Sequence, residues 1–176
     1  MNIWLKEFDR DDDAIFLELL NELSSYTDVY AKPTEGILTE DEFNYFKDAR
    51  IKMKEGIDLP EGVIPTTSYW VMCGDIPIGY STLKHYVDLE KPGGHFGCCL
   101  KKDYQNKGIG KVVAELLSKI AFEEYEIEEV VFTAKKENEQ SKNSLKNIGA
   151  EFVSERDGYY FYIYDLKNKF SKEGRK

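Results

Sequence analysis

The first third of the chain carries the hydrophobic spacing of two amphipathic helices. Between Asp11 and Leu23 the apolar residues fall on one face, and three aspartates crowd the predicted start, where we expect them to be solvated. A second helix is predicted from Thr39, because Glu42 stands three residues on and completes a capping box. The stretch 56–65 holds two prolines and two glycines and is therefore predicted to be a loop.

From residue 68 onward the helical period gives way to runs rich in β-branched and aromatic residues. The segments 68–73 and 76–83 are predicted to form a hairpin, because Gly74 and Asp75 make a two-residue turn. The elements predicted after it are a strand at 95–100, a helix from Lys111 to about Tyr125, a strand at 129–134, a helix at 141–148 ended by Gly149, and a hairpin of strands 151–154 and 159–166. This order predicts an α/β domain with a mixed sheet, antiparallel early and locally parallel near residue 100.

Length and composition fit one folded domain, predicted over residues 1–167, followed by a polar tail at 168–176 that is expected to fray. Apolar residues make up 41 % of the chain, which supports a packed core. The net charge of −9 argues against nucleic acid as a partner, because phosphate binding needs a basic surface. Most of the acidity is expected to serve solubility, although it also attracts cationic partners such as amines.

The three cysteines make an odd number, and the chain opens without the positive and apolar stretches of a secretory leader. No run approaches the roughly 18 apolar residues that span a bilayer. Cys98 and Cys99 are neighbours in a predicted strand and point to opposite faces, so they cannot bind one metal together. We therefore expect buried, unpaired thiols, no metal, no membrane contact and a cytoplasmic protein.

The segment from Leu100 to Lys111 carries the most chemistry in the chain. It joins a predicted strand to a helix through Gly108 and Gly110, and glycine lets a ligand come close to the backbone. The first amides of a helix lack internal partners and lie at the positive end of its dipole, so they bind anions such as a diphosphate. Four lysines gather here in an otherwise acidic chain. The simpler alternative is a strand-to-helix turn that only needs glycine.

Three phosphate-binding patterns compete for this loop. The P-loop pattern needs Ser or Thr after Gly-Lys, but Gly110 and Lys111 are followed by Val112. The dinucleotide pattern needs a third glycine where this chain has Val113. The third pattern, Gln/Arg-x-x-Gly-x-Gly/Ala, is matched from Gln105 to Gly110, between a predicted strand and an amphipathic helix.

On these residues the chain resembles the GCN5-related N-acetyltransferase (GNAT) superfamily, over about residues 69–166. Residues 75–80 resemble the hairpin that opens the family sheet, and residues 138–152 resemble its Asn-x-x-Ser/Ala segment, short helix and closing Gly-Phe. Residues 93–97 resemble a bacterial group of predicted acetyltransferases within the superfamily. The resemblance implies a mixed, mostly antiparallel central sheet with a V-shaped splay between its two middle strands, flanked by about four helices.

The resemblance also implies that acetyl-CoA binds in the splay, without a metal. Backbone amides from Asn106 to Lys111 would hold the diphosphate. The main chain near Cys98 and Leu100 would pair with the pantetheine arm, and an amide there would polarise the thioester carbonyl. The segment 138–141 would line the same arm, although a helix N-cap explains it equally well. The implied cofactor-binding residues are Cys98, Leu100, Gln105, Asn106, Lys107, Gly108, Ile109, Gly110, Lys111, Asn138 and Ser141.

The expected activity is transfer of an acetyl group from acetyl-CoA to a primary amine of a small molecule or peptide, by direct attack in a ternary complex. The family's usual acid and base are missing, because their positions hold Leu145 and Gly97. His95, at the start of the predicted strand, is the substitute candidate for a catalytic base, with a structural role as the simpler alternative.

A second hypothesis follows from the missing acid and base. The chain would then be a non-catalytic acyl-CoA-binding or sensing module on the same fold. The aromatic-rich last strand, 159–166, is a candidate homodimer interface.

Overall fold

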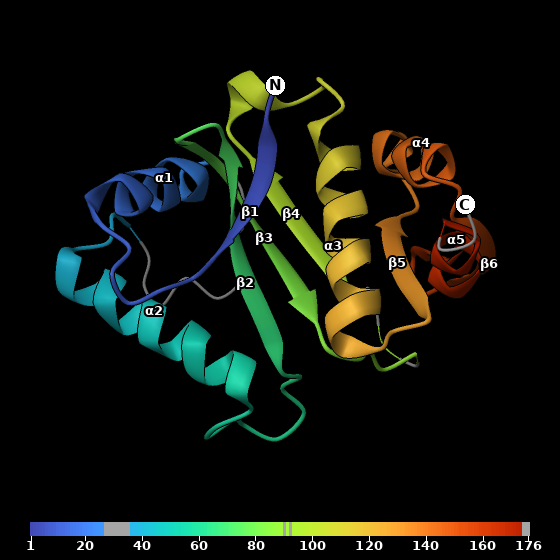
Figure 1. Cartoon of the computed structure of the whole chain (residues 1–176), viewed down its shortest axis with the longest axis horizontal. Helices are drawn as coiled ribbons and strands as arrows, with labels where there is room; N and C mark the ends of the chain where they lie inside the picture. Colours follow the sequence, from blue (N-terminus) through green and yellow to red (C-terminus); the bar gives the residue numbers. More distant parts are fainter. Residues whose placement is uncertain (27–35, 90, 92, 174–176) are drawn as a thin grey trace.

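The computed structural model describes residues 1–26, 36–89, 91 and 93–173. Its elements are, in chain order, β1 (Ile3–Glu7), α1 (Ala14–Ser24), α2 (Glu40–Glu55), β2 (Thr66–Cys73), β3 (Ile76–Lys84), β4 (Phe96–Leu100), the 3-10 helix η1 (Lys102–Tyr104), α3 (Ile109–Tyr125), β5 (Glu129–Lys135), α4 (Glu139–Asn147), β6 (Glu151–Arg156), β7 (Tyr159–Asp165) and α5 (Leu166–Glu173). The strands form a four-stranded sheet of order β1-β2-β3-β4 and a three-stranded sheet of order β5-β7-β6. Figure 1 shows the two sheets side by side, with α3 between their adjacent strands.

Helices cover both faces of the four-stranded sheet. α1 and α2 pack on one face around Trp70, which is fully buried and stacks on Phe8 with 4.0 Å between ring centroids. α3 packs on the opposite face, where Val113 and Leu117 share one core with Leu100 of β4 and residues of the second sheet. This helix therefore ties the two sheets together.

The predicted fold class is confirmed, since the structure is a mixed α/β domain with antiparallel sheets. The described residues contain five α-helices, one more than the resemblance implied. The expected parallel pairing is wrong, because every strand ladder in the described part of the chain is antiparallel. β4 and β5 run in the same direction (Figure 1), but they are joined at His95 and Val131 and form no ladder beyond them. This divergence is the predicted splay.

The acidic start of the first helix differs from the prediction. The helix begins at Ala14, three residues later than expected, because the Asp13 side chain accepts the Ile15 N–H (3.1 Å) as its N-cap. Asp12 is buried instead of solvated, and its carboxylate accepts the Trp70 Nε1–H at 2.7 Å and pairs with Lys6. A buried carboxylate needs such partners, so Asp12 anchors the chain to the core.

Other local predictions are confirmed. Thr39 and Glu42 form the capping box that begins α2, and Gly56 ends this helix with a left-handed φ of 71°. Gly149 follows α4 with φ 91°, a backbone conformation that side chains rarely adopt.

The two ends of the chain hold elements that were not predicted. β1 was missed, and it pairs with β2 from Ile3 to Glu7. Residues 168–173 belong to α5, so the expectation of a frayed tail is wrong there, and Phe170 packs on Phe122 with 5.4 Å between ring centroids. The boundary of the domain at residue 167 stays a prediction. β7 pairs on both sides, and the edges of its sheet are β5 and β6, so the proposed dimer through the last strand loses its basis.

Ser118 gives a first prediction about stability. This residue of α3 is fully buried, and its hydroxyl has no hydrogen-bond partner in the described structure. Replacing it by alanine removes an unsatisfied polar group and raises helix propensity, so we expect a gain of about 1 kcal/mol in the free energy of unfolding. Urea unfolding measures this gain, and Ser144→Ala on exposed α4 is the control, expected to change little. A destabilised Ser118→Ala protein contradicts the prediction.

Candidate functional site

The loop between β4 and α3 is closed by its own residues. The Gln105 side chain donates from Nε2 to the carbonyl oxygen of Leu100 at 2.9 Å, which folds the loop back on the end of β4. Asn106 and Gly108 adopt left-handed conformations, with φ of 59° and 76°. These two residues turn the chain so that α3 begins at Ile109 with Gly108 as N-cap.

The amides of this loop are oriented for an anion. No N–H from Asn106 to Gly110 donates to another protein atom in the described part of the chain, whereas the Lys111 N–H donates to the Gly108 carbonyl at 3.1 Å. A Cβ at Gly108 or Gly110 would meet no atom within 4 Å, so no other part of the protein packs against the α-carbons of these two glycines. Free amides at a helix start fit a diphosphate.

Only part of the predicted lysine cluster is available to such an anion. Lys101 forms an ion pair with Glu22 of α1 at 2.8 Å, and the Lys102 ammonium lies over the Tyr26 ring at 4.6 Å. Lys107 and Lys111 are exposed and pair with no carboxylate among the described residues. These two lysines flank the free amides and can attract phosphate, although the Lys107 ammonium also lies over the Tyr104 ring at 5.8 Å.

The predicted Asn138–Ser141 segment lies beside this loop. Asn138 is the N-cap of α4, since its Oδ1 accepts the Ser141 N–H at 3.0 Å, so the simpler alternative explains the asparagine. Gln140, which the sequence did not single out, donates from Nε2 to Oδ1 of Asn106. This hydrogen bond brings the two predicted halves of the site together, although 34 residues separate them.

β4 is an edge strand of the four-stranded sheet, and its outer side faces the splay. The Lys84 N–H donates to the His95 carbonyl at 2.8 Å, and the Lys101 N–H donates to the Ile78 carbonyl at 2.9 Å. Hydrogen-bonded pairs alternate along an antiparallel ladder, so Gly97 and Cys99 face β3 with their backbone groups. The backbone groups of residues 96, 98 and 100 therefore point away from β3, as an added strand requires.

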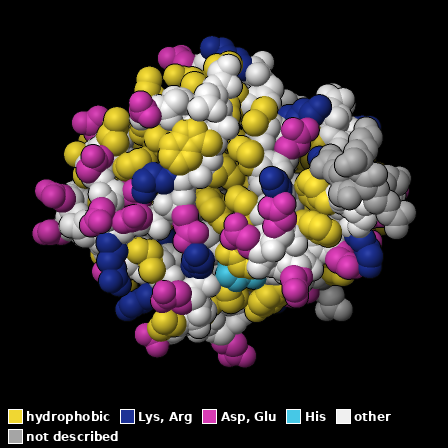
Figure 2. Space-filling model, viewed as in Figure 1, with side chains coloured by type: hydrophobic (Ala, Val, Ile, Leu, Met, Phe, Trp, Pro, Cys, Tyr) yellow, Lys and Arg dark blue, Asp and Glu magenta, His cyan; other side chains and the backbone are white. Residues whose placement is uncertain are grey.

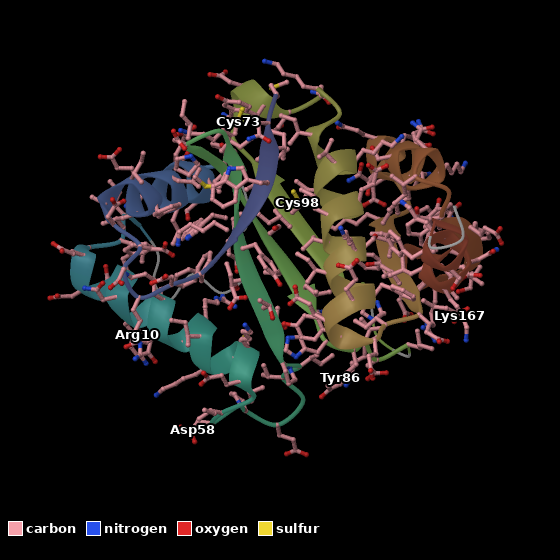
Figure 3. All side chains as sticks on the ribbon, viewed as in Figure 1. Arg10, Asp58, Cys73, Tyr86, Cys98 and Lys167 are labelled. Carbon is pink, nitrogen blue, oxygen red and sulfur yellow. The ribbon has the colours of Figure 1, made fainter. Side chains whose placement is uncertain are left out.

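Cys98 sits in the middle of this edge. Figure 3 places it near the centre of the molecule and Cys73 toward one end of the sheet. All three cysteines are free thiols, as predicted, but the expectation that they are buried is wrong, since Cys98 is exposed and Cys73 and Cys99 are half-buried. The Cys98 side chain is exposed to solvent, yet surrounding protein desolvates its sulfur and raises the pKa of the thiol to about 12. The thiol therefore stays protonated, and weakly nucleophilic, at neutral pH.

Comparison with known proteins identifies the family of the chain. Residues 2–151 match the family model described as the acetyltransferase (GNAT) domain. The chain belongs to the GNAT acetyltransferase family. No significant match is found among curated proteins. The GNAT assignment therefore rests on the family model, and solved structures support the fold.

Three solved structures show the shared GNAT fold. The N-acetyltransferase PseH of Campylobacter jejuni, in complex with acetyl coenzyme A, superposes with a TM-score of 0.61 at 15% identity, over 93% of this chain and 99% of its own. A GNAT acetyltransferase from Bacillus anthracis gives 0.63 at 20% identity, over 95% and 96%. The spermidine/spermine N-acetyltransferase SpeG of Vibrio cholerae gives 0.67 at 13% identity, over 97% and 99%. At these identities the likeness shows the fold alone.

Leu145 and Gly97 stand at the two positions where the resemblance to the family predicts a tyrosine and an acidic side chain. Leu145 takes the place of the expected tyrosine and is buried in the core that α3 shares with the second sheet. Gly97, in the place of the expected acid, has no side chain to offer.

The described residues hold no group of three His, Cys, Asp or Glu side chains that could bind a metal ion. None of the described helices is both long and apolar enough to cross a bilayer.

His95 is buried at the closed end of the splay. The ring Nδ1 of His95 accepts the Val131 backbone N–H at 2.9 Å. The backbone N–H of His95 donates to the Val131 carbonyl, also at 2.9 Å. Burial lowers the pKa of His95 to about 4; hydrogen bonding with the Val131 backbone opposes this shift, and the charge of Lys84 adds to it. Its role as a catalytic base stays a prediction, and these contacts favour the structural role instead.

This environment predicts acid-sensitive stability. In the unfolded chain His95 binds a proton as the pH falls through about 6.5, whereas in the folded protein it does so only near pH 4. The unfolded state therefore gains protons first, and the free energy of unfolding should fall by about 2 kcal/mol between pH 7 and pH 5. His85, whose pKa burial and Lys54 also lower, adds to this loss. Urea unfolding of wild type and His95→Asn at both pH values measures the His95 share, and an equal loss in both proteins contradicts it.

A groove of about 420 Å³ opens elsewhere, between the C-terminal half of α2 and the ends of β1 and β2. It shares no residue with the predicted acetyl-CoA site, and its Glu7 and Lys54 pair with each other at 2.6 Å.

Figure 2 shows acidic and basic side chains intermixed over the visible face, without a continuous basic stripe. The free amides at the start of α3 remain the candidate site for an anionic ligand.

Proposed function

We propose that this GNAT protein transfers an acetyl group from acetyl-CoA to a primary amine of a small molecule or peptide, by direct attack in a ternary complex. The single observation that carries the proposal is the set of free amides at Asn106–Gly110, next to the unpaired edge of β4. A diphosphate and a peptide-like arm are the two parts of coenzyme A that such a pair of features suits.

In this proposal the chain binds the donor mainly through its backbone. The amides of residues 106–110 hold the diphosphate, with Lys107 and Lys111 beside it. The outward-facing groups of Cys98 and the N–H of Leu100 pair with the amides of the pantetheine arm, and Gln140 and Ser141 border the same cleft. The Leu100 carbonyl already accepts from Gln105, so the loop and the strand edge are held in one arrangement.

The chemical step needs orientation and proton transfer. The amine nitrogen forms a bond to the thioester carbon, the carbon–sulfur bond breaks, and the thiolate receives a proton. A primary ammonium has a pKa of about 10.4, so its proton must leave before attack. With Leu145 and Gly97 in the usual acid and base positions, we assign proton transfer to water and rate enhancement to orientation and to a polarising amide at Cys98.

The nature of the acceptor follows from charge and from the relatives. The net charge of −9 favours a cationic acceptor. SpeG is named a spermidine/spermine N-acetyltransferase and PseH an N-acetyltransferase, and both share the fold. We therefore place primary amines first among the acceptors of this chain, in small molecules or peptides.

A thiol-release assay tests the proposal. Acetyl-CoA is offered with panels of polyamines, amino acids, aminoglycosides and peptides, and free thiol is measured. We expect amine-dependent release by the wild-type protein, and much weaker release by a Gly110→Asp variant. Tight binding of CoA in calorimetry, together with silence across all panels, would instead favour the non-catalytic acyl-CoA-binding module. Absence of CoA binding would remove both hypotheses.

A further inference from the structure

We propose that His95 is a positioning residue whose ring replaces a backbone carbonyl and fastens β4 to β5, thereby setting the opening of the acetyl-CoA cleft. The inference rests on the proposed function, because it assigns the cleft to acetyl-CoA. It gives His95 a role other than that of a base.

The contacts of His95 explain why a side chain is needed at this point. The His95 backbone carbonyl accepts the Lys84 N–H of β3 at 2.8 Å. It therefore points toward β3 and does not accept a hydrogen bond from β5. Toward β5, the backbone N–H of His95 donates to the Val131 carbonyl at 2.9 Å. The ring Nδ1 of His95 accepts the Val131 backbone N–H, also at 2.9 Å. The imidazole thus supplies the hydrogen-bond acceptor for the Val131 N–H, because the His95 carbonyl already faces β3.

The surroundings hold this joint closed. The His95 side chain is only 5% exposed. A Cβ at Gly94 would lie 2.5 Å from the Val131 carbonyl oxygen, so the backbone before His95 packs directly on β5. Phe96 and Phe132 meet edge to face, with 5.3 Å between ring centroids, on the other side of the joint.

Beyond this joint the strands separate. No ladder links β4 to β5 in the described residues. The backbone groups of Cys98 and Leu100 point away from β3 and into the splay. The distance between those groups and β5 therefore depends on the angle fixed at His95 and Val131. Losing the ring acceptor leaves the buried Val131 N–H unpaired and loosens the angle at which the arm of coenzyme A is received.

Three substitutions separate positioning from catalysis. His95→Asn keeps an acceptor oxygen at about the place of Nδ1, His95→Leu keeps the volume without an acceptor, and His95→Gln carries its acceptor one carbon too far. CoA affinity by calorimetry, kcat, and the pH dependence of kcat are measured for each. We expect the CoA dissociation constant to rise about tenfold in His95→Leu and His95→Gln and to stay within about threefold in His95→Asn. The kcat–pH profile of His95→Asn should match that of the wild type.

The outcomes are distinguishable. CoA binding unchanged in all three variants overturns the positioning role while leaving the proposed function intact. A large loss of kcat in His95→Asn, with unchanged CoA affinity and an altered acid limb of the pH profile, identifies a catalytic base and overturns it too. Wild-type protein that does not bind CoA refutes the proposed function and with it this inference. Should His95→Leu fail to fold, the comparison of His95→Asn with His95→Gln decides.

Discussion

Replacing Gly110 by aspartate is expected to weaken CoA binding by about 100-fold or more, because a carboxylate would lie where the diphosphate binds and like charges in contact cost several kcal/mol. Gly110 is the second residue of α3, and a Cβ there meets no atom within 4 Å. A carboxylate in the first turn of a helix is otherwise favourable, so the folded protein should be at least as stable as the wild type. Isothermal titration with CoA measures the affinity, and thermal unfolding checks the fold.

A matched neutral variant separates charge from size. Gly110→Asn adds nearly the same volume without the charge, and its loss of affinity should stay within about tenfold. If both variants bound CoA as tightly as the wild type, the diphosphate would have to bind elsewhere.

Replacing Gly94 by alanine is expected to destabilise the protein by about 3 kcal/mol, as overpacking against rigid neighbours does. The added Cβ would lie 2.5 Å from the Val131 carbonyl oxygen and 2.9 Å from Phe132 Cα. Both are main-chain atoms of β5, so no side chain can turn aside, and the strand itself must move. Urea unfolding measures the loss, and CoA affinity should fall with it, because the same movement opens the joint at His95.

Gly110→Ala is the control for this change. The same methyl group there meets open space, and alanine favours helix over glycine, so the free energy of unfolding should stay equal or rise slightly. A loss below about 1 kcal/mol in Gly94→Ala would show that β5 yields easily and that the joint is not tight.

The loop could be predicted from the sequence because its requirements are local. Gly108 and Gly110 stand where the backbone turns and meets open space, and α3 begins within two residues of the expected position. Thr39 and Glu42 act within one helical turn, so the start of α2 was equally readable. Such elements need only neighbours a few residues away.

The rest depends on partners far along the chain. Asp12 is buried because Trp70, 58 residues later, donates to it, and no periodicity near Asp12 reveals that. The His95 ring accepts a hydrogen bond from Val131, 36 residues on, and no pattern near His95 in the sequence reveals this contact. The edge position of β6 follows from the order β5-β7-β6, which strand patterns alone do not encode.

A crystal structure of the protein with coenzyme A tests the central claim most directly. The account predicts diphosphate oxygens within about 3 Å of the amide nitrogens of residues 106–110, and the pantetheine arm alongside the outward-facing edge of β4. Coenzyme A bound with its diphosphate away from these amides, for instance in the groove between α2 and β1, would contradict it.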